Sequence, residues 1–248
     1  MFKNIHIVIT RPVHQARNIQ QQLLAQGAKV TLFPVMEIQE VGVCDQLNMD
    51  LFDWLIFISP NAVKYAQKYL LNINFATKTI AAIGKKTAET LQHYGIQTDV
   101  VPRQHFNSES FLQLSATQSV QAKRILIFRG QGGRELLARK LQQRGATVQY
   151  AEVYQRLCPQ VSSEVLKQQW QQKALDRLVI TSSEGLHNLY KMSHGDWIKQ
   201  LPLLLGSPRM QQMAQYLGHQ GHIIVANNPS DDAILHCLKN WVQQELVE

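Results

Sequence analysis

The sequence predicts an α/β protein made of two similar lobes, each a doubly wound parallel sheet with helices on both faces. Three observations support this fold class. Short apolar runs of strand length alternate with helical patterns along almost the whole chain. Segments of the first half match segments of the second half at nearly constant offsets. The 248 residues are enough for one large domain or two small ones.

In the first half, short apolar runs mark the strands, and a pattern of helical period follows most of them. The first helix is typical, because Ile19, Leu23 and Leu24 share one face and Gly27 supplies a common helix cap. The expected strands lie at 5–9, 29–33, 54–58, 79–83 and 99–101, and the expected helices at 14–26, 61–70, 87–94 and 108–114.

The pattern restarts in the second half. The Gln-rich stretch 168–172 is interpreted as an uncharged, exposed helix face. Strands are expected at 124–128, 147–151, 177–181, 203–205 and 223–226, and helices at 134–144, 185–192, 209–217 and from 230 onward.

Two internal repeats indicate that these elements form two copies of one α/β domain. Residues 3–38 match 123–156, so that Arg11 aligns with Arg129 at an offset of 118. A second repeat aligns 53–59 with 176–182 at an offset of 123. Apolar residues often match by chance, whereas ordered matches of Arg, Gly, Asp and Ser do not. Each copy holds about five strands in β-α-β-α-β order, the element count of a flavodoxin-like domain.

The charge balance favours an anionic partner. The chain carries 25 Lys and Arg against 18 Asp and Glu, a formal net charge of +7. The basic residues are scattered, without a nucleic-acid-binding motif or a long basic run, so neither nucleic acid nor a membrane is expected as partner. No apolar run approaches the ~20 residues of a membrane-spanning helix. The expected partner is a small polyanion.

The cysteines and the first residues favour a reduced, cytoplasmic protein. Cys44, Cys158 and Cys237 are an odd number without a Cys-x-x-Cys pair, so neither a disulfide framework nor a zinc site is indicated. Met1 to Lys3 lead directly into a short apolar strand, unlike a secretory signal peptide.

Binding residues are expected in the turns that follow the strands. Ligands of open α/β sheets collect at the carboxyl ends of strands, where helix N-termini direct free N–H groups outward. Six such turns carry hydroxyl groups, glycines or basic side chains, and together they predict a multi-anion site in a cleft between the lobes. Helix capping is the competing interpretation of each single turn. The candidate substrate-binding residues are Thr10, Arg11, Ser59, Asn61, Gly84, Lys86, Thr87, Arg129, Gly130, Gly133, Thr181, Ser182, Ser183, Gly206 and Ser207.

Sharper motifs are incomplete. Gly130-x-Gly132 begins a dinucleotide-binding pattern, but Glu135 stands in place of its third glycine, where a carboxylate opposes pyrophosphate. The run 84–87 resembles the end of a P-loop without its upstream glycine. His219 and His222 are interpreted as surface residues, because no acidic or cysteine ligand accompanies them. The prediction is an anion-binding cleft with no metal, no organic cofactor and no obvious catalytic group.

Seven motifs occur along the chain in the order seen in a known family. They are Thr10-Arg11-Pro12, Ser59-Pro60-Asn61-Ala62-Val63, Gly84-x-x-Thr87-Ala88, Arg129-Gly130-x-x-Gly133-Arg134, Arg144-Gly145-Ala146-x-Val148, Val153-Tyr154-x-Arg156 and Thr181-Ser182-x-x-Gly185-Leu186. Over nearly the whole chain this order resembles the uroporphyrinogen-III synthase family. One turn departs from it: the family usually has a Gly-x-x-Thr-Ala-like run where this chain has Gly206-Ser207-Pro208, so Ser207 is expected to supply the hydroxyl there.

The resemblance implies a cofactor-independent lyase of tetrapyrrole and haem biosynthesis, acting as a monomer. The family converts hydroxymethylbilane, a linear tetrapyrrole with eight carboxylates, into cyclic uroporphyrinogen III with inversion of ring D and loss of water. An octa-anion fits both the basic surplus and the N–H donors of the turns. The substrate supplies its own pyrrole nucleophile, so the main task of the protein is to fold it into the spiro-forming geometry.

The resemblance also implies a crossed arrangement of the repeats. Residues 1–35 join 176–248 in one lobe, 43–150 form the other, and 36–42 and 151–175 are hinge and linker segments. The extended segments 35–41 and 153–159, with Pro34 and Pro159 at their outer ends, are expected to run side by side as a two-strand hinge.

Tyr154 is the one side chain expected to act as a catalytic acid. Its repeat mate is Met36, so the shared scaffold does not require a phenol at this position. Phenols are protonated at neutral pH, and a proton donor assists the loss of hydroxide from the bilane. The alternative is a hinge tyrosine that packs its ring and bonds a backbone carbonyl.

Two other functions are compatible with the architecture. A two-lobed binding or sensor protein for anionic small molecules would have the same turns without catalysis. A two-lobed sugar-nucleotide transferase would need a nucleotide pocket in one lobe, whereas here the anion-binding turns are spread over both copies. The synthase is the favoured interpretation.

Overall fold

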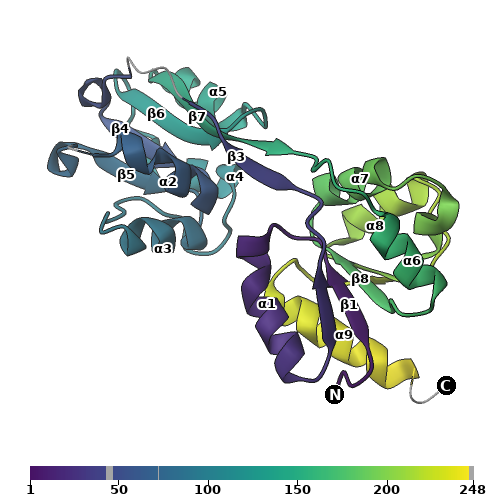
Figure 1. Ribbon diagram of the computed structural model, residues 1–248. Helices are drawn as coiled ribbons and strands as arrows, with labels where there is room; N and C mark the ends of the chain where they lie inside the picture. The colour runs from purple at the N-terminus through teal and green to yellow at the C-terminus, as the bar shows by residue number, and fades with distance from the viewer. Residues whose placement is uncertain (43–46, 72, 246–248) are drawn as a thin grey trace. The chain divides into compact units, whose positions relative to one another are not determined.

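The computed structural model describes residues 1–42, 47–71 and 73–245, and it divides into two compact units (Figure 1). The first unit comprises Met1–Glu37 and Leu157–Glu248, and the second comprises Ile38–Arg156. Cys44 lies outside the described residues, and Cys158 and Cys237 are free thiols. Each unit has its own five-stranded sheet and its own apolar core.

The sheet of the first unit has the order β10-β9-β8-β1-β2, and all its neighbouring strands are parallel. Successive residues of β1 face opposite layers: Ile7 and Ile9 pack with α1 and α9, whereas Val8 packs with α6 and α7. The strands are β1 (His6–Ile9), β2 (Lys29–Leu32), β8 (Arg177–Ile180), β9 (Leu203–Leu205) and β10 (Ile223–Val225). The helices are α1 (Val13–Ala25), α6 (Glu164–Gln171), α7 (Ser183–Met192), α8 (Pro208–Tyr216) and α9 (Asp231–Glu245).

The sheet of the second unit has the order β3-β7-β6-β4-β5. An isolated parallel bridge from Ala81 to Val100 continues it beyond β5. Leu126 and Phe128 of β6 pack with α2 and α3, while Ile125 and Ile127 pack with α4 and α5. The strands are β3 (Glu37–Glu40), β4 (Trp54–Phe57), β5 (Thr79–Ala82), β6 (Arg124–Gly130) and β7 (Thr147–Leu157). The helices are α2 (Pro60–Ala66), α3 (Lys85–His93), α4 (Ser108–Leu112) and α5 (Leu136–Gln143).

The first sheet has the flavodoxin-like strand order 2-1-3-4-5, which reads β2-β1-β8-β9-β10. In the second sheet β7-β6-β4-β5 and the Val100 bridge take the corresponding places in space, although β6 and β7 follow β4 and β5 in the chain, and β3 adds an edge strand beside β7. The two repeats found in the sequence place β6 on β1 and β4 on β8, so one duplication accounts for both sheets. The predicted α/β class with parallel, doubly wound sheets is confirmed.

The two segments at which the chain passes between the units are neighbours in the second sheet. β3 is hydrogen-bonded to β7, and Val41 N donates to Val153 O at 3.0 Å. The structure corrects the expectation that 151–175 is hinge and linker: residues up to Leu157 continue β7, and α6 buries Leu166 in the core of the first unit. Leu166 and Trp170 stand four residues apart on one helix face, a signal that the surrounding glutamines obscured.

The interpretation of His219 as a surface residue is wrong. Only 9% of the residue is exposed, and its Nδ1 lies 2.6 Å from Tyr190 Oη. Burial lowers the pKa of this imidazole below its ordinary value. The preceding Gly218 suggested a solvent-exposed loop, and nothing in the local sequence indicates that the loop packs against α7.

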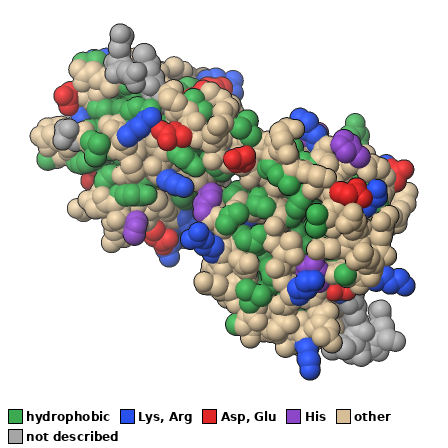
Figure 2. Space-filling view, in the orientation of Figure 1, with side chains coloured by type: hydrophobic (Ala, Val, Ile, Leu, Met, Phe, Trp, Pro, Cys, Tyr) green, Lys and Arg blue, Asp and Glu red, His purple; other side chains and the backbone are tan. Residues whose placement is uncertain are grey.

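The surface carries dispersed charge. Lys and Arg side chains are scattered over the face shown in Figure 2 and do not form one patch. In the described part of the chain, no helix is both long and apolar enough to cross a membrane.

The topology predicts which fragments fold. Residues 38–156 contain β3 to β7 and both helix layers of the second unit, so we expect this fragment to unfold cooperatively by itself. Residues 1–117 contain β1 without β8 and β4 without β6, so we expect no cooperative transition from them. Urea unfolding followed by circular dichroism checks both fragments. A stably folded 1–117 fragment would contradict the crossed arrangement.

Candidate functional site

The candidate turns of the first unit lie together at the carboxyl ends of β1, β8 and β9. Thr10 Oγ1 donates to Val179 O at 2.9 Å, which ties the turn after β1 to β8. Gly206 approaches the turn after β8 so closely that an added Cβ would lie 3.1 Å from Thr181 Cα. Parallel pairing therefore gathers 10–11, 181–183 and 206–207 at one edge of the sheet, as predicted.

The candidate turns of the second unit are gathered in the same way. Residues 59–61 follow β4, 84–87 follow β5, and 129–133 span the end of β6 and the turn after it, and β4 lies between β5 and β6 in the sheet. Tyr154 lies on β7, next to β6. Each unit thus forms its own set of turns, and the predicted cleft between the two sets stays a prediction.

Two of the candidate serines cap helices. Ser59 Oγ accepts from Ala62 N at 3.1 Å, and Ser182 Oγ accepts from Gly185 N at 3.0 Å. The capping interpretation is therefore correct for both. A serine that caps a helix through its oxygen keeps its hydroxyl proton, so each of the two can still donate one hydrogen bond to a ligand.

The N-terminus of α3 carries two lysines. Gly84 provides no side-chain cap, the first turn contains no acidic residue, and Lys85 and Lys86 occupy it instead. Cations at a helix N-terminus are repelled by the positive end of the helix dipole. A bound anion would be attracted both by the lysines and by the dipole. Lys85 is paired with Glu89 at 3.7 Å, whereas Lys86 is exposed.

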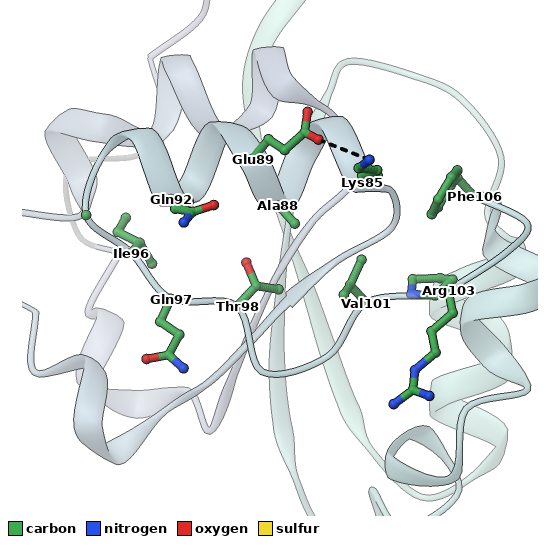
Figure 3. A pocket seen from close by; sticks show the side chains of 12 residues that line it. Lys85, Ala88, Glu89, Gln92, Ile96, Gln97, Thr98, Val101, Arg103 and Phe106 are labelled. Atoms are coloured by element: carbon green, nitrogen blue, oxygen red, sulfur yellow. Dashed lines mark ion pairs between the residues drawn. The ribbon is translucent and has the colours of Figure 1, made fainter.

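A cavity of about 690 Å³ extends from this turn along α3 (Figure 3). Phe106 closes one end, where an added Cβ on Gly84 would lie 3.2 Å from Phe106 Cβ. Thr98 points toward α3, and its Oγ1 is buried without a hydrogen-bond partner (Figure 3). Sequence reasoning missed these two residues, because neither belongs to a motif.

The Arg11 side chain is engaged in hydrogen bonds and an ion pair within the first unit. It donates to Thr181 Oγ1 at 3.1 Å, to the Pro229 carbonyl at 2.5 Å and to the Asp231 carboxylate. Only 10% of its side chain is exposed. Arg11 therefore joins the turns after β1 and β8 to the start of α9, and its charge is already balanced.

Arg129, the repeat mate of Arg11, is also occupied inside its own unit. It is 3% exposed, and Glu135 accepts from its Nη1 at 3.0 Å. Both arginines, which the sequence placed among the candidate substrate-binding residues, thus organise turns inside their own units.

Tyr154 is completely buried in the core of the second unit. Its Oη lies 3.1 Å from Ser59 Oγ and accepts from Arg156 Nη2 at 3.2 Å. An added Cβ on Gly130 would lie 2.5 Å from Tyr154 Cε2, so the role of Gly130 is to permit this close approach. The ring packs as the alternative interpretation expected, but its hydroxyl bonds the side chains of Ser59 and Arg156 where that interpretation expected a backbone carbonyl.

Among the described residues, no group of three or more His, Cys, Asp or Glu side chains could hold a metal ion.

Comparison with known proteins identifies the family. The family model for uroporphyrinogen-III synthase HemD matches residues 17–236. The uroporphyrinogen-III synthase of Escherichia coli is 33% identical over 245 residues, which cover 94% of this chain and 99% of that protein. That of Proteus mirabilis is 35% identical over 191 residues, covering 74% of this chain and 96% of the other.

Solved structures share the fold. The uroporphyrinogen-III synthetase of Helicobacter pylori matches with a TM-score of 0.64 at 18% identity, covering 96% of this chain and 99% of that one. A mutant uroporphyrinogen III synthase of Thermus thermophilus matches with a TM-score of 0.61 at 17% identity, covering 97% and 99%. The resemblance read from the motifs is confirmed, and the chain belongs to the uroporphyrinogen-III synthase family.

Proposed function

We propose that this chain cyclises hydroxymethylbilane to uroporphyrinogen III, with inversion of ring D and loss of water, as a lyase that needs no cofactor. The observation that carries the proposal is the 33% identity to the Escherichia coli synthase, which extends over 94% of this chain. The matched region includes turns in both units. We further propose that the protein acts as a cytoplasmic monomer without nucleic acid, because one chain supplies all of these turns.

The chemistry asks little of the protein beyond geometry and one proton. The C–O bond of the ring A hydroxymethyl group breaks, and the ring D carbon that already carries the bridge to ring C attacks, which forms a C–C bond and a spiro intermediate. The bond from this ring D carbon to the bridge then breaks, and the bridge carbon bonds the free α-carbon of ring D, which inverts the ring. A proton converts the leaving hydroxide to water, and the proton released from that α-carbon when the pyrrole regains aromaticity restores the acid. Turns that hold carboxylates fix the reacting atoms near each other, which is a large part of such a rate enhancement.

The proposed acid is Tyr154, and its burial indicates a route for the proton. In this structure the phenol has no solvent-exposed surface, so its proton leaves through a group that it contacts. Ser59 Oγ is that group, 3.1 Å away and half-buried at the turn after β4. One hydroxyl can accept from Ala62 N and from Tyr154 Oη while donating to the leaving group, which uses its full hydrogen-bonding capacity.

The assay for the function starts from enzymatically generated hydroxymethylbilane. The pure protein is added, the products are oxidised, and the I and III isomers are resolved by chromatography. Formation of the III isomer in proportion to protein concentration supports the synthase. Binding of the porphyrinogen without any III isomer would favour the alternative, a two-lobed binding or sensor protein for anionic small molecules.

Removing the phenol should slow turnover without unfolding the protein. Tyr154→Phe keeps the ring under Gly130, so we expect an unchanged melting temperature and similar product affinity, with kcat lowered by ~10-fold or more. Ser59→Ala should lower kcat similarly, and the double variant should be no slower than the slower single one, because the two groups act in series.

Tyr65→Phe is the matched control. Tyr65 packs 6.0 Å from the Tyr154 ring and donates to Ile38 O, away from Ser59. We expect normal turnover from this variant. Unchanged kcat in Tyr154→Phe would remove Tyr154 from the mechanism, and a lowered melting temperature with proportionate loss of activity would make it a packing residue.

Lys86 and Arg11 should respond differently to substitution by alanine. Lys86→Ala removes an exposed charge at the N-terminus of α3, so we expect product binding weaker by ~1–2 kcal/mol and unchanged stability. Arg11→Ala removes the ion-pair partner of Asp231, which keeps a hydrogen bond from Asn18, so we expect the free energy of unfolding to fall by ~1–3 kcal/mol. Product titrations at two salt concentrations and urea unfolding measure both effects.

The titrations at two salt concentrations test whether product binding is electrostatic. If charge attraction holds the substrate carboxylates, product affinity falls as ionic strength rises. A dissociation constant that does not change with salt would contradict the proposed electrostatic binding.

A further inference from the structure

The loop of residues 130–133, which connects β6 to the start of α5, has a conformation that only glycine adopts easily. Gly132 and Gly133 have φ values of 71° and 104°. An added Cβ on Gly133 would lie 3.0 Å from Arg129 Nη2. The 130–133 loop therefore wraps around the guanidinium of Arg129.

Arg129 bonds this loop at several points. Its Nε donates to Gly130 O at 3.2 Å, and its Nη2 donates to Gly132 O. Its Nη1 donates to Glu135 Oε1 at 3.0 Å, so one planar side chain ties both ends of the loop together. Glu152 adds a second carboxylate 3.8 Å from Nε.

Tyr150 completes the arrangement from the neighbouring strand. Its ring lies under the guanidinium, 4.4 Å from centroid to Cζ, and its Oη donates to Glu135 Oε2 at 2.7 Å. The hydrogen bond from Tyr150, together with Arg129, lowers the pKa of Glu135. Burial and the Glu135 carboxylate raise the pKa of Tyr150 to about 12. The carboxylate thus stays charged and the phenol stays protonated at neutral pH.

The 130–133 loop is in direct contact with Tyr154. The register between β6 and β7 shifts between Arg129 and Gly130, which brings Gly130 opposite Tyr154. Gln131 N donates to Tyr154 O at 2.8 Å, and Gly130 lies against the ring. A shift of the loop would therefore move the phenol relative to Ser59.

The first unit has no counterpart to this loop. At the repeat offset of 118, Glu135 aligns with Arg17 and Tyr150 aligns with Leu32. Helix α1 begins at Val13, whereas α5 begins at Leu136, which aligns with position 18. The same scaffold forms in the first unit without the loop, so the fold alone does not require it.

We propose that Arg129, Glu135 and Tyr150 are positioning residues that hold the 130–133 loop against Tyr154 and thereby set its phenol for reaction. This inference rests on the proposed function. Arg129 was expected to bind substrate, but its guanidinium is buried and bonded to the loop, so all three residues are proposed to act through the loop and Tyr154.

Glu135→Ala is the main test, because the Glu135 side chain is 52% exposed and its loss leaves the core intact. We expect kcat to fall about tenfold, with KM changed much less and the melting temperature unchanged. Glu135→Gln, whose amide oxygen still accepts a hydrogen bond, should recover much of this loss. Tyr150→Phe keeps the ring under Arg129 and should resemble Glu135→Ala, and the double variant should add little.

Hydrogen exchange gives a readout that does not depend on activity. Faster exchange of the amides of 131–134 in Glu135→Ala and Tyr150→Phe, with unchanged exchange in the first unit, supports the proposal. Matched controls are Glu164→Ala, whose carboxylate pairs with nearby Lys167 at 3.6 Å, and Tyr216→Phe at a position that is 91% exposed. Both controls lie in the first unit and should leave exchange and turnover as in the wild type.

Three outcomes would overturn the proposal. Unchanged exchange of 131–134 means that the three residues do not hold the loop. Faster exchange with unchanged kcat means that the loop does not position Tyr154. A melting temperature lowered in proportion to activity means that the residues only stabilise the fold. If the wild type forms no III isomer, the proposed function fails separately, and the exchange data still decide whether the loop is held.

Discussion

Parallel pairing of strands is the constraint on which the rest of this molecule depends. Register pairs such as Ile9 with Val179 and Phe57 with Ala82 align the carboxyl ends of neighbouring strands. Each aligned end is followed by a turn and a helix N-terminus, so free N–H groups accumulate at one edge of each sheet. Binding groups made in this way would come from the backbone, which agrees with candidate site residues that are largely Gly, Ser and Thr.

Duplication supplied two such edges, and later divergence made them different. The repeat aligns β1 with β6, and both units use an arginine at the carboxyl end of that strand, Arg11 or Arg129, to organise the turns. In the first unit the arginine reaches Asp231 at the start of α9. In the second it holds a glycine-rich loop against Tyr154. The asymmetry lies where the proposed chemistry lies.

The two arginines that stand in the sequence motifs contribute little free charge to the net charge of +7. Arg11 and Arg129 are buried and paired, so they contribute order to the turns and little free charge. The exposed cations, such as Lys86 at the N-terminus of α3, supply the attraction that a polycarboxylate would meet. Burial of these two guanidinium groups costs desolvation, and the geometry that they fix in the turns accounts for that cost.

The sequence by itself determined the fold class, the duplication, the order of the strands through the repeats, and the set of turns that carries the candidate site. These follow from local periodicity and from motifs that a single stretch of chain contains. Tertiary structure alone decided which side chains are free. The pairing of Arg11 with Asp231 spans 220 residues, and the contact of Tyr154 with Ser59 spans 95. No local pattern encodes such partners, because they meet only when parallel pairing brings distant strand ends to the same edge. The burial of His219 and the packing of Leu166 in α6 were missed for the same reason: burial is set by what packs against a segment, and that is a property of the folded chain.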